Sequence, residues 1–356
     1  MAEYRVGIIG AGGIAAKLHL PEMQTVEAAA VTLIAGRRSA RLETLSRKFD
    51  IPHWTQDYDA VIADDSLDAV IIALPHPLHV PWGLKALAAG KHVLIQKPLS
   101  TSLDEADRFV EAVEAGDRCV LALPYVARPS VLAARDLVAR GDLGRISALH
   151  ARHSHGGPEV YYAGIQQILE EQPDEDLWFF DADQADVGAL FDMGVYSVAT
   201  LVTMGGSVTR VTARCATVDK PTQLEDTAIV ILDFESGALG TAETGWCDAA
   251  RTSRFSVHGT GGKLTSPGHD CELTLFQPSS QTDEDAPALE RTVPLNDYPQ
   301  RNAHQHWMDC IRTGSQPPLS NAATARHITE ILLAALKSSR ENVTVDIHSR
   351  LGNTTD

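Results

Sequence analysis

Short apolar runs and segments of helical spacing alternate through the first third of the chain. The apolar runs predict strands at Arg5–Ile9, Val31–Ala35, Ala69–Leu74, His92–Ile95 and Cys119–Leu123. The segments between them predict helices at Ala15–Met23, Ala40–Phe49, Val80–Ala89 and Leu103–Ala115. Strands that are apolar throughout are typical of a parallel sheet covered on both faces. We therefore expect an α/β domain of the dinucleotide-binding, Rossmann type over residues 1–123.

The pattern changes after Pro124, where alternation of period two becomes common. It predicts strands at Ile146–His153, Val208–Val218, Thr227–Phe234, Ala238–Trp246 and Arg254–His258, typical of an antiparallel sheet. Helical spacing returns at Val131–Arg140, Ala303–Arg312 and Ala322–Ser339, and Gln277–Ala288 has the composition of an exposed loop. We expect a second, α+β domain over residues 124–356, built on an open, mostly antiparallel sheet.

Composition narrows the classes of partner. The chain has 356 residues, with 30 Lys and Arg against 47 Asp and Glu, a net charge of −17 that disfavours nucleic acid as a partner. No apolar run is long enough to cross a bilayer, and the N-terminus lacks the pattern of a signal peptide. The five cysteines form no CxxC pair, which favours reduced thiols in the cytoplasm and gives no zinc pattern.

A glycine-rich turn, Gly10-Ala11-Gly12-Gly13-Ile14-Ala15, joins the first predicted strand to its helix. Gly10 permits the tight turn, Gly12 lets the backbone approach a pyrophosphate, and Ala15 keeps the helix close to the sheet. The N–H groups of the helix N-terminus then face the phosphates. A turn that only connects the two elements would look similar, but its place in a βαβ unit favours dinucleotide binding through Gly10, Gly12, Gly13 and Ile14.

The end of the second predicted strand indicates which dinucleotide is bound. NAD sites place an acidic residue there for the ribose 2′-hydroxyl, whereas this chain has Gly36, Arg37 and Arg38. The two guanidinium groups could bind a 2′-phosphate, although they could also be only solvated at the start of the next helix. We therefore expect NADP ahead of NAD as the cofactor.

Three further residues are candidates for catalysis. Lys97 follows the strand His92–Ile95, at the edge of a parallel sheet where ligands bind, and a partly dry cleft could lower its pKa. Taken alone, a lysine at this position is more often an ordinary surface residue. Asp192 and Tyr196 are one turn apart in an apolar helical segment and share a face, which is equally typical of a partly buried helix with one polar side.

His153 and His155 alternate at a strand end, but with no third ligand they are predicted to be ordinary surface histidines.

Taken together, these segments resemble the Gfo/Idh/MocA family of oxidoreductases. The resemblance covers nearly the whole chain and rests on GAGGIA at 10–15, ALPHPLH at 73–79, GKHVLIQKPLS at 90–100, GDLGRI at 141–146, WFFD at 178–181 and GALFDMGVY at 188–196. It implies a Rossmann domain followed by an α/β domain whose open sheet often forms an oligomer interface, here a homodimer or homotetramer. It also implies that the cofactor contacts include Leu74, Pro75, His79, Gln96, Lys97 and Trp178.

The resemblance also suggests roles for the catalytic candidates. Lys97 corresponds to the lysine of the family's E-K-P motif, near the nicotinamide, and Asp192 matches the family's aspartate. Tyr196 stands where many members have histidine. A tyrosine there resembles the branch of dihydrodiol and xylose dehydrogenases, in which the phenol transfers the proton. Three departures weaken the transfer of cofactor contacts and substrate. The family's glutamate is Gln96, its glycine triplet is Asp186-Val187-Gly188, and the arginine of its WRFD motif is Phe179.

The resulting hypothesis is reversible hydride transfer between NADP(H) and a carbinol or carbonyl carbon of a sugar, cyclitol or sugar derivative. Tyr196 would move the proton, Lys97 would polarise the oxygen and Asp192 would hold a neighbouring hydroxyl. One alternative is a glycoside-processing enzyme that oxidises its sugar transiently with tightly bound NAD. Another is a nucleotide-sensing regulator without catalysis. We expect the substrate contacts to come from loops such as Ser154–Gln172.

Overall fold

A computed structural model describes residues 4–27, 29–170, 177–268, 271–280, 282–283 and 285–352. The chain forms two compact units. The first combines Met1–Tyr125 with Pro158–Asp186 and Arg301–Thr329, and the second combines Val126–Gly157 with Val187–Gln300 and Glu330–Asp356. Two segments beyond residue 124 thus belong to the same unit as the N-terminal domain that the sequence predicts, and each unit is described by itself below.

The first unit is a doubly wound α/β fold. Its six parallel strands are β1 (Tyr4–Ile9), β2 (Ala29–Ala35), β3 (His53–Thr55), β4 (Ala69–Ile72), β5 (His92–Ile95) and β6 (Val120–Ala122). Their order across the sheet is β3-β2-β1-β4-β5-β6, so the order reverses beside β1, and ligands bind outside the carboxyl ends of strands at such a point. The predicted parallel sheet is confirmed, with β3 as an added edge strand.

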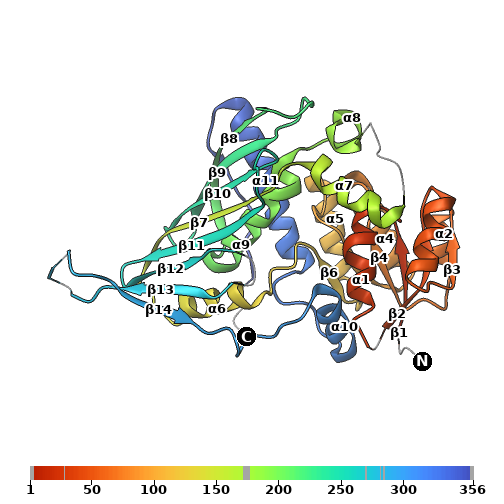
Figure 1. The fold of residues 1–356 in the computed structure, drawn as a ribbon, viewed down its shortest axis with the longest axis horizontal. Coiled ribbons are helices and arrows are strands. Elements are labelled where there is room, and N and C mark those ends of the chain that lie inside the picture. The colour runs from red at the N-terminus through yellow and green to blue at the C-terminus, as the bar shows by residue number, and fades with distance from the viewer. Residues whose placement is uncertain are drawn as a thin grey trace. The chain divides into compact units, whose positions relative to one another are not determined.

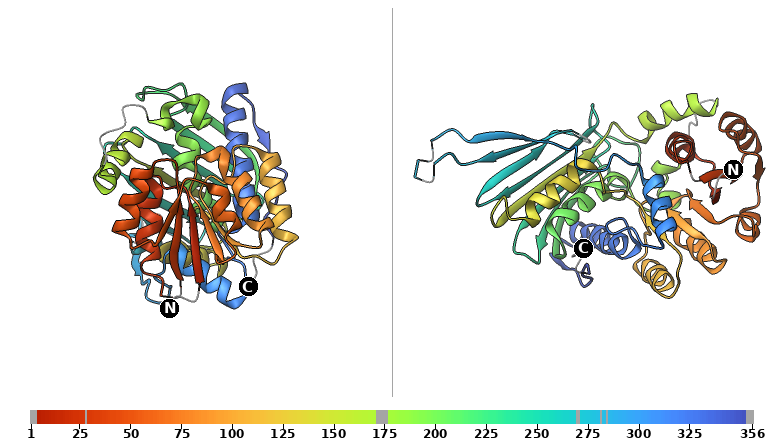
Figure 2. Two further views of the ribbon diagram at one scale, coloured as in Figure 1. Left: turned by 90° about the vertical axis from the view of Figure 1, so that its right-hand side faces the viewer. Right: turned by 90° about the horizontal axis from the view of Figure 1, so that it is seen from below.

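Helices cover both faces of this sheet, as the left view of Figure 2 shows. One core contains residues of a π-helical turn η1 (Ala15–His19), α1 (Leu20–Met23), α2 (Ser39–Lys48), α7 (Pro158–Leu169) and α10 (Ala303–Thr313). The other contains residues of α3 (Tyr58–Ala63), α4 (His79–Ala88), α5 (Leu103–Glu114) and the first turns of α11 (Ala322–Glu341). Both cores bury strand side chains, which explains why these strands are apolar at every position.

Three short helical segments complete the first unit: η2 (His76–Leu78), η3 (Trp178–Phe180) and α8 (Ala182–Ala185). The expected substrate loop Ser154–Gln172 was wrong for most of its length. Pro158–Leu169 form helix α7, whose Ile165 and Leu169 are buried in the first core, and Gln172 lies outside the described residues. Part of the apolar side of this helix is therefore packed in the core, whereas Val160 is exposed.

The second unit is built on a nine-stranded open sheet (Figure 1). Its strands are β7 (Ile146–Ser154), β8 (Val208–Ala216), β9 (Thr227–Phe234), β10 (Leu239–Gly245), β11 (Thr252–Gly259), β12 (Gly262–Ser266), β13 (Leu273–Gln277), β14 (Leu289–Val293) and β15 (Val345–Asp346). The order is β14-β13-β12-β11-β7-β10-β9-β8-β15, antiparallel except between β7 and β10. The mostly antiparallel sheet that the sequence predicts is confirmed.

One face of this sheet is covered by helices. A π-helical turn, η4 (Leu190–Gly194), continues into α9 (Val195–Gly205), and both pack on β7 and β10, with α6 (Pro129–Ala139) packed on α9. The segment Ala182–Gly205 is long and apolar enough to cross a membrane, but 89% of its most apolar window is buried inside the protein. Burial in the core therefore accounts for its apolar composition.

Candidate active site

The glycine-rich turn between β1 and η1 has the shape that a dinucleotide requires. Gly10 has φ +114°, and a Cβ there would lie 2.1 Å from the Ala73 carbonyl oxygen, so another residue would collide with the backbone after β4. A Cβ on Gly12 would meet nothing within 4 Å, so this glycine faces open space rather than the core. Since packing does not require a glycine at position 12, the missing side chain fits close approach of a pyrophosphate.

The rest of the turn is held by tight packing. A Cβ on Gly13 would lie 2.6 Å from Cδ1 of Ile165 on α7, and one on Gly36 would lie 2.7 Å from Cβ of Ala11. Ile14 is half-buried at the start of the helix, and Ala15 is fully buried. The turn and the end of β2 are therefore in direct contact, as a dinucleotide site spanning both would require.

Arg37 and Arg38 are both exposed where β2 ends. The Arg37 backbone is fixed because its carbonyl oxygen accepts a 2.7 Å hydrogen bond from Nε2 of Gln56, and Arg38 directly precedes α2. Neither Gly36 nor its two neighbours in sequence is acidic. The guanidinium groups of Arg37 and Arg38 are groups that can bind a phosphate by charge-assisted hydrogen bonds.

Leu74, Pro75 and His79 lie after β4, beside the segment that follows β5. The buried ring of His79 bridges the two segments, with Nε2 2.7 Å from the Leu74 carbonyl oxygen and Nδ1 2.6 Å from the Pro98 carbonyl oxygen. Burial lowers the pKa of His79 to about 4, and the two carbonyl contacts oppose this shift. His79 thus ties the backbone next to Lys97 to the segment around Leu74.

Gln96 and Lys97 follow β5 at the same edge of the sheet. Gln96 is buried and Lys97 is half-buried. The Lys97 backbone N–H donates a 2.8 Å hydrogen bond to Oε1 of Gln96, which fixes the orientation of the amide. Trp178 belongs to an aromatic cluster: its ring lies 5.2 Å from that of His76 and 4.0 Å from that of Phe179.

In the second unit, the carboxylate of the half-buried Glu225 binds the start of the helical segment that bears Asp192 and Tyr196. Oε1 of Glu225 accepts hydrogen bonds from Gly188 N at 3.0 Å and Leu190 N at 3.3 Å, and burial raises the pKa of Glu225. A Cβ on Gly188 would lie 2.1 Å from the Glu225 carbonyl oxygen, so glycine is required there. These contacts fix the position of η4, a π-helical turn with Asp192 at its centre. Turns of this kind are found at many functional sites.

Asp192 is buried and contacts two rings. The indole N–H of the fully buried Trp246 donates a 2.9 Å hydrogen bond to its Oδ2, and Nε2 of His155 lies 3.6 Å from the same oxygen. His155 is oriented by Gly157 N, which donates to its Nδ1 at 2.9 Å. Because Nδ1 accepts, the proton of a neutral His155 ring is on Nε2, facing Asp192.

Tyr196 lies one turn after Asp192 and stacks on a histidine. The two rings, of Tyr196 and His153, have centroids 6.0 Å apart and are inclined by 28°. Nδ1 of His153 is 3.1 Å from Oγ of Ser197, which donates to the Glu243 carbonyl oxygen at 2.9 Å. Since Ser197 uses its own proton on Glu243, His153 is the donor in its contact with Ser197.

The expectation of a surface His153 was wrong, because the residue is 3% exposed, and His155 is half-buried. Their alternation on a strand did indicate a shared face, but only the packing of η4 and α9 shows that this face is covered. Trp246 had no signal in the sequence beyond its place at the end of a predicted strand. Among the described residues, no group of three His, Cys, Asp or Glu side chains could hold a metal ion.

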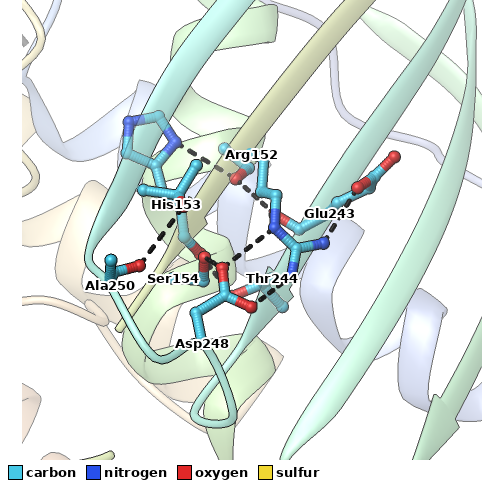
Figure 3. A network of polar contacts seen from close by, with 9 residues as sticks. Arg152, His153, Ser154, Glu243, Thr244, Asp248 and Ala250 are labelled. Carbon is cyan, nitrogen blue, oxygen red and sulfur yellow. Dashed lines mark hydrogen bonds and ion pairs between the residues drawn. The ribbon is translucent and has the colours of Figure 1, made fainter. Parts of the chain in front are cut away.

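Figure 3 shows an ion network that holds the end of β7 against the turn after β10. Arg152 binds both carboxylate oxygens of Asp248, at 3.1 and 2.6 Å, and Oε2 of Glu243 at 3.0 Å, while Ser154 donates to Asp248. Hydrogen bonding to Arg152 lowers the pKa of Asp248. Asp248 N also donates to the His155 carbonyl oxygen at 3.2 Å, so the network fixes the backbone that carries His155.

Two family models match this chain. Residues 4–123 match the family model described as "Oxidoreductase family, NAD-binding Rossmann fold", and residues 131–265 match "GFO/IDH/MocA C-terminal domain". A D-xylose 1-dehydrogenase (NADP(+)) of Haloferax volcanii is 31% identical, over 87% of this chain and 90% of its own. The chain belongs to the Gfo/Idh/MocA family. It is an NAD(P)-dependent oxidoreductase, and either NADP or NAD fits as its cofactor.

Other relatives span almost the whole chain. A scyllo-inositol 2-dehydrogenase (NAD(+)) of Bacillus subtilis is 24% identical, over 97% of this chain and 96% of its own. Among solved structures, a levoglucosan dehydrogenase in complex with NADH and L-sorbose has a TM-score of 0.82 at 22% identity, and the match covers 97% of this chain and 99% of that one. At that identity the likeness shows a shared fold.

Proposed function

We propose that this Gfo/Idh/MocA oxidoreductase interconverts a carbinol and a carbonyl group on a sugar, cyclitol or sugar derivative, with NADP preferred to NAD. The observation on which this proposal rests is a polar cluster on the helix-covered face of the sheet in the second unit. There Asp192 is held by Trp246, lies 3.6 Å from His155 and is one helical turn from Tyr196. The relatives named as xylose and inositol dehydrogenases support a polyhydroxylated substrate.

Each residue has a task in this proposal. Bound NADP would be held by the turn Gly10–Ile14 and by Arg37 and Arg38, and its nicotinamide would accept or supply the hydride. Tyr196 takes the hydroxyl proton when the alcohol is oxidised and returns it in reduction. Lys97 polarises the reacting oxygen as a cation. Asp192, fixed by Trp246, accepts a hydrogen bond from a neighbouring hydroxyl.

The test follows nicotinamide absorbance with a panel of sugars, cyclitols and glycosides, and each cofactor in turn. Once a substrate is found, Tyr196→Phe and Lys97→Ala should each lower kcat by about 10²–10⁴-fold, the usual contribution of general acid–base catalysis. The matched controls are Tyr298→Phe and Lys85→Ala, whose side chains bind Asp136 and Asp59, and these should retain turnover. Full turnover by both test variants would refute the assigned roles.

His155 is the alternative proton carrier, because it faces Asp192 as an acid–base pair would. If His155→Asn abolished turnover and Tyr196→Phe preserved it, the pair His155–Asp192 would replace Tyr196 in the proposal. The two variants therefore decide which group moves the proton. Both substitutions keep a polar or aromatic group of similar size, so loss of folding can be checked by Tm.

We propose assembly into a homodimer or homotetramer through the sheet of the second unit. Ile229, Ile231 and Leu239 are 48%, 46% and 54% exposed and lie on one face of β9 and β10, which leaves an apolar strip in water. Light scattering after gel filtration should show that Ile231→Glu dissociates the assembly. Val160→Glu, a change at a 62% exposed position of α7, should not. The five free cysteines support a cytoplasmic location.

A further inference from the structure

Four polar side chains form a continuous chain of contacts through the first core. Nε2 of Gln96 lies 3.2 Å from Nε2 of His19, and Nδ1 of His19 lies 2.8 Å from Nε2 of His304. Nδ1 of His304 then lies 2.8 Å from Oε2 of Glu22. The chain begins beside Lys97 and ends at a carboxylate that is 27% exposed, while both histidines are fully buried.

The direction of every hydrogen bond in this chain follows from its two ends. The Lys97 backbone N–H can only donate, so Oε1 of Gln96 faces it and the Gln96 NH₂ group points at His19. Nε2 of His19 must therefore accept, which leaves the proton of the neutral ring on Nδ1. By the same step His304 accepts at Nε2 and donates from Nδ1 to Glu22, and a carboxylate can only accept. The donor at the Lys97 end and the acceptor at the Glu22 end therefore require the same direction of hydrogen bonding.

The surroundings of His19 favour its uncharged form. Burial first, and then the nearby His304 and His79, lower the pKa of His19 well below its usual value. A proton added to Nε2 of His19 would also face the NH₂ group of Gln96, donor against donor. The groups that face His19 are His79 from α4, His304 from α10 and Gln96 after β5, while Glu22 from α1 faces His304.

We propose that His19, His304 and Glu22 are positioning residues that hold the Gln96 amide, and with it the Lys97 backbone, in one orientation at the nicotinamide site. The role at the nicotinamide rests on the proposed function, whereas the directed chain itself does not. The proposal also explains why this chain has an amide where the resemblance leads one to expect a glutamate. With Glu22 at one end, the other end must supply a donor.

A proton count makes this explanation testable. The three gaps between the four side chains each need one proton, and the wild type fills them with one from Gln96 and one from each neutral imidazole. In Q96E both ends are acceptors, so the chain must take up one further proton. In Q96E/E22Q the amide is at the other end, and two neutral rings suffice again with every hydrogen bond reversed. E22Q alone keeps an acceptor for His304 and leaves the direction unchanged.

The first measurement is ¹⁵N NMR of the histidine rings in the protein without nucleotide. At neutral pH, His19 and His304 should both be Nδ1–H tautomers in the wild type and in the control E22Q. Both should be Nε2–H tautomers in Q96E/E22Q, and Q96E should contain one imidazolium. A wild-type His19 in the Nε2–H or imidazolium form would overturn the chain, whether or not the enzyme turns over sugars.

The second measurement is the pH dependence of stability. In Q96E the extra proton raises the pKa of a histidine in the folded state above the unfolded value of about 6.5. Stability is then fully present below that pH and is lost as pH rises, with the unfolding constant increasing by up to about tenfold per pH unit relative to the wild type. Q96E/E22Q should remove this slope. Equal slopes in Q96E and the double variant would refute the coupling of Gln96 to Glu22.

The proposed role of this chain at the nicotinamide site is tested with the same variants in the presence of nucleotide and substrate. kcat of Q96E should fall over the pH range in which its extra proton is lost, and Q96E/E22Q should not show this fall. If the NMR tautomers are as assigned but no variant oxidises a sugar, the proposed function fails and the directed chain stands. If turnover is normal and Q96E/E22Q keeps the wild-type tautomers, the chain fails and the proposed function stands.

Discussion

The indole N–H of Trp246 donates a 2.9 Å hydrogen bond to Asp192, and both side chains are buried. Trp246 directly follows β10, whereas Asp192 lies on η4, so one hydrogen bond links the sheet to the helix that carries the candidate acid and phenol. This donor therefore helps to fix the orientation of the buried carboxylate.

Trp246→Phe should therefore affect both stability and turnover. It removes a hydrogen bond to a charged group, worth about 1.5–3 kcal/mol, and leaves a cavity. We expect a loss of that order in the free energy of unfolding by urea, and a drop of about tenfold in kcat/KM. Trp54→Phe is the matched control, because Trp54 is 39% exposed on β3, and it should change neither quantity. Unchanged kinetics in Trp246→Phe would show that Asp192 needs no fixed orientation.

Gly10 and Gly12 should respond differently to alanine. Gly10→Ala places a Cβ against the Ala73 carbonyl at a positive φ, so we expect unfolding to become easier by at least about 1–3 kcal/mol. Gly12→Ala has room within the protein, so Tm should be retained while the Kd for dinucleotide rises by about tenfold or more. Thermal unfolding and calorimetric titration separate the two effects. Normal nucleotide affinity in Gly12→Ala would place the pyrophosphate elsewhere.

Arg37 and Arg38 should decide between the two cofactors. Replacing either with alanine removes a charge-assisted hydrogen bond to the 2′-phosphate, worth about 1.5–3 kcal/mol, so KM for NADP should rise roughly 10–100-fold. KM for NAD should stay nearly constant. Arg47→Ala is the control, because Arg47 lies in the last turn of α2, away from the end of β2, and its exposed side chain pairs with Glu170. Equal activity with both cofactors in the wild type would remove the NADP preference.

The buried histidines of the first unit should make the protein sensitive to acid. The folded-state pKa of His79 is about 4 and that of His19 is also lowered, both mainly by burial, whereas an unfolded histidine has a pKa of about 6.5. Stability is therefore present above about pH 6.5 and is lost as pH falls towards 4, with an upper bound of about 3 kcal/mol from His79. Urea unfolding from pH 7 to 4.5 measures the slope.

Two glutamine variants test whether His79 causes this loss of stability with falling pH. His79→Gln should flatten the acid branch, because the unfolded chain loses one group that binds a proton in this range. His348→Gln, at an exposed position, should leave it unchanged. If His79→Gln kept the wild-type slope, His79 would be charged in the folded protein at neutral pH, held by its two carbonyl contacts.

Sequence periodicity alone located most of the elements, because a strand or helix with one packed face repeats its apolar residues at a local interval. The strand His92–Ile95 and the strand Thr227–Phe234 have the predicted bounds. Short strands such as His53–Thr55 have too few residues for a period to show, and their pairing partners are distant in sequence. The glycine-rich turn could also be predicted from the sequence, since it depends only on neighbouring residues.

The polar contacts of the candidate site were decided by tertiary structure. His19 and His304 are 285 positions apart, and Asp192 meets Trp246 across 54, so no local pattern could pair them. Their chemistry depends on burial and on which atom faces which donor, and those properties arise only when helices and sheets pack. The sequence determined that Gln96 replaces the family's glutamate. Only the fold places two buried histidines and a carboxylate behind it, and so supplies a physical reason for the amide.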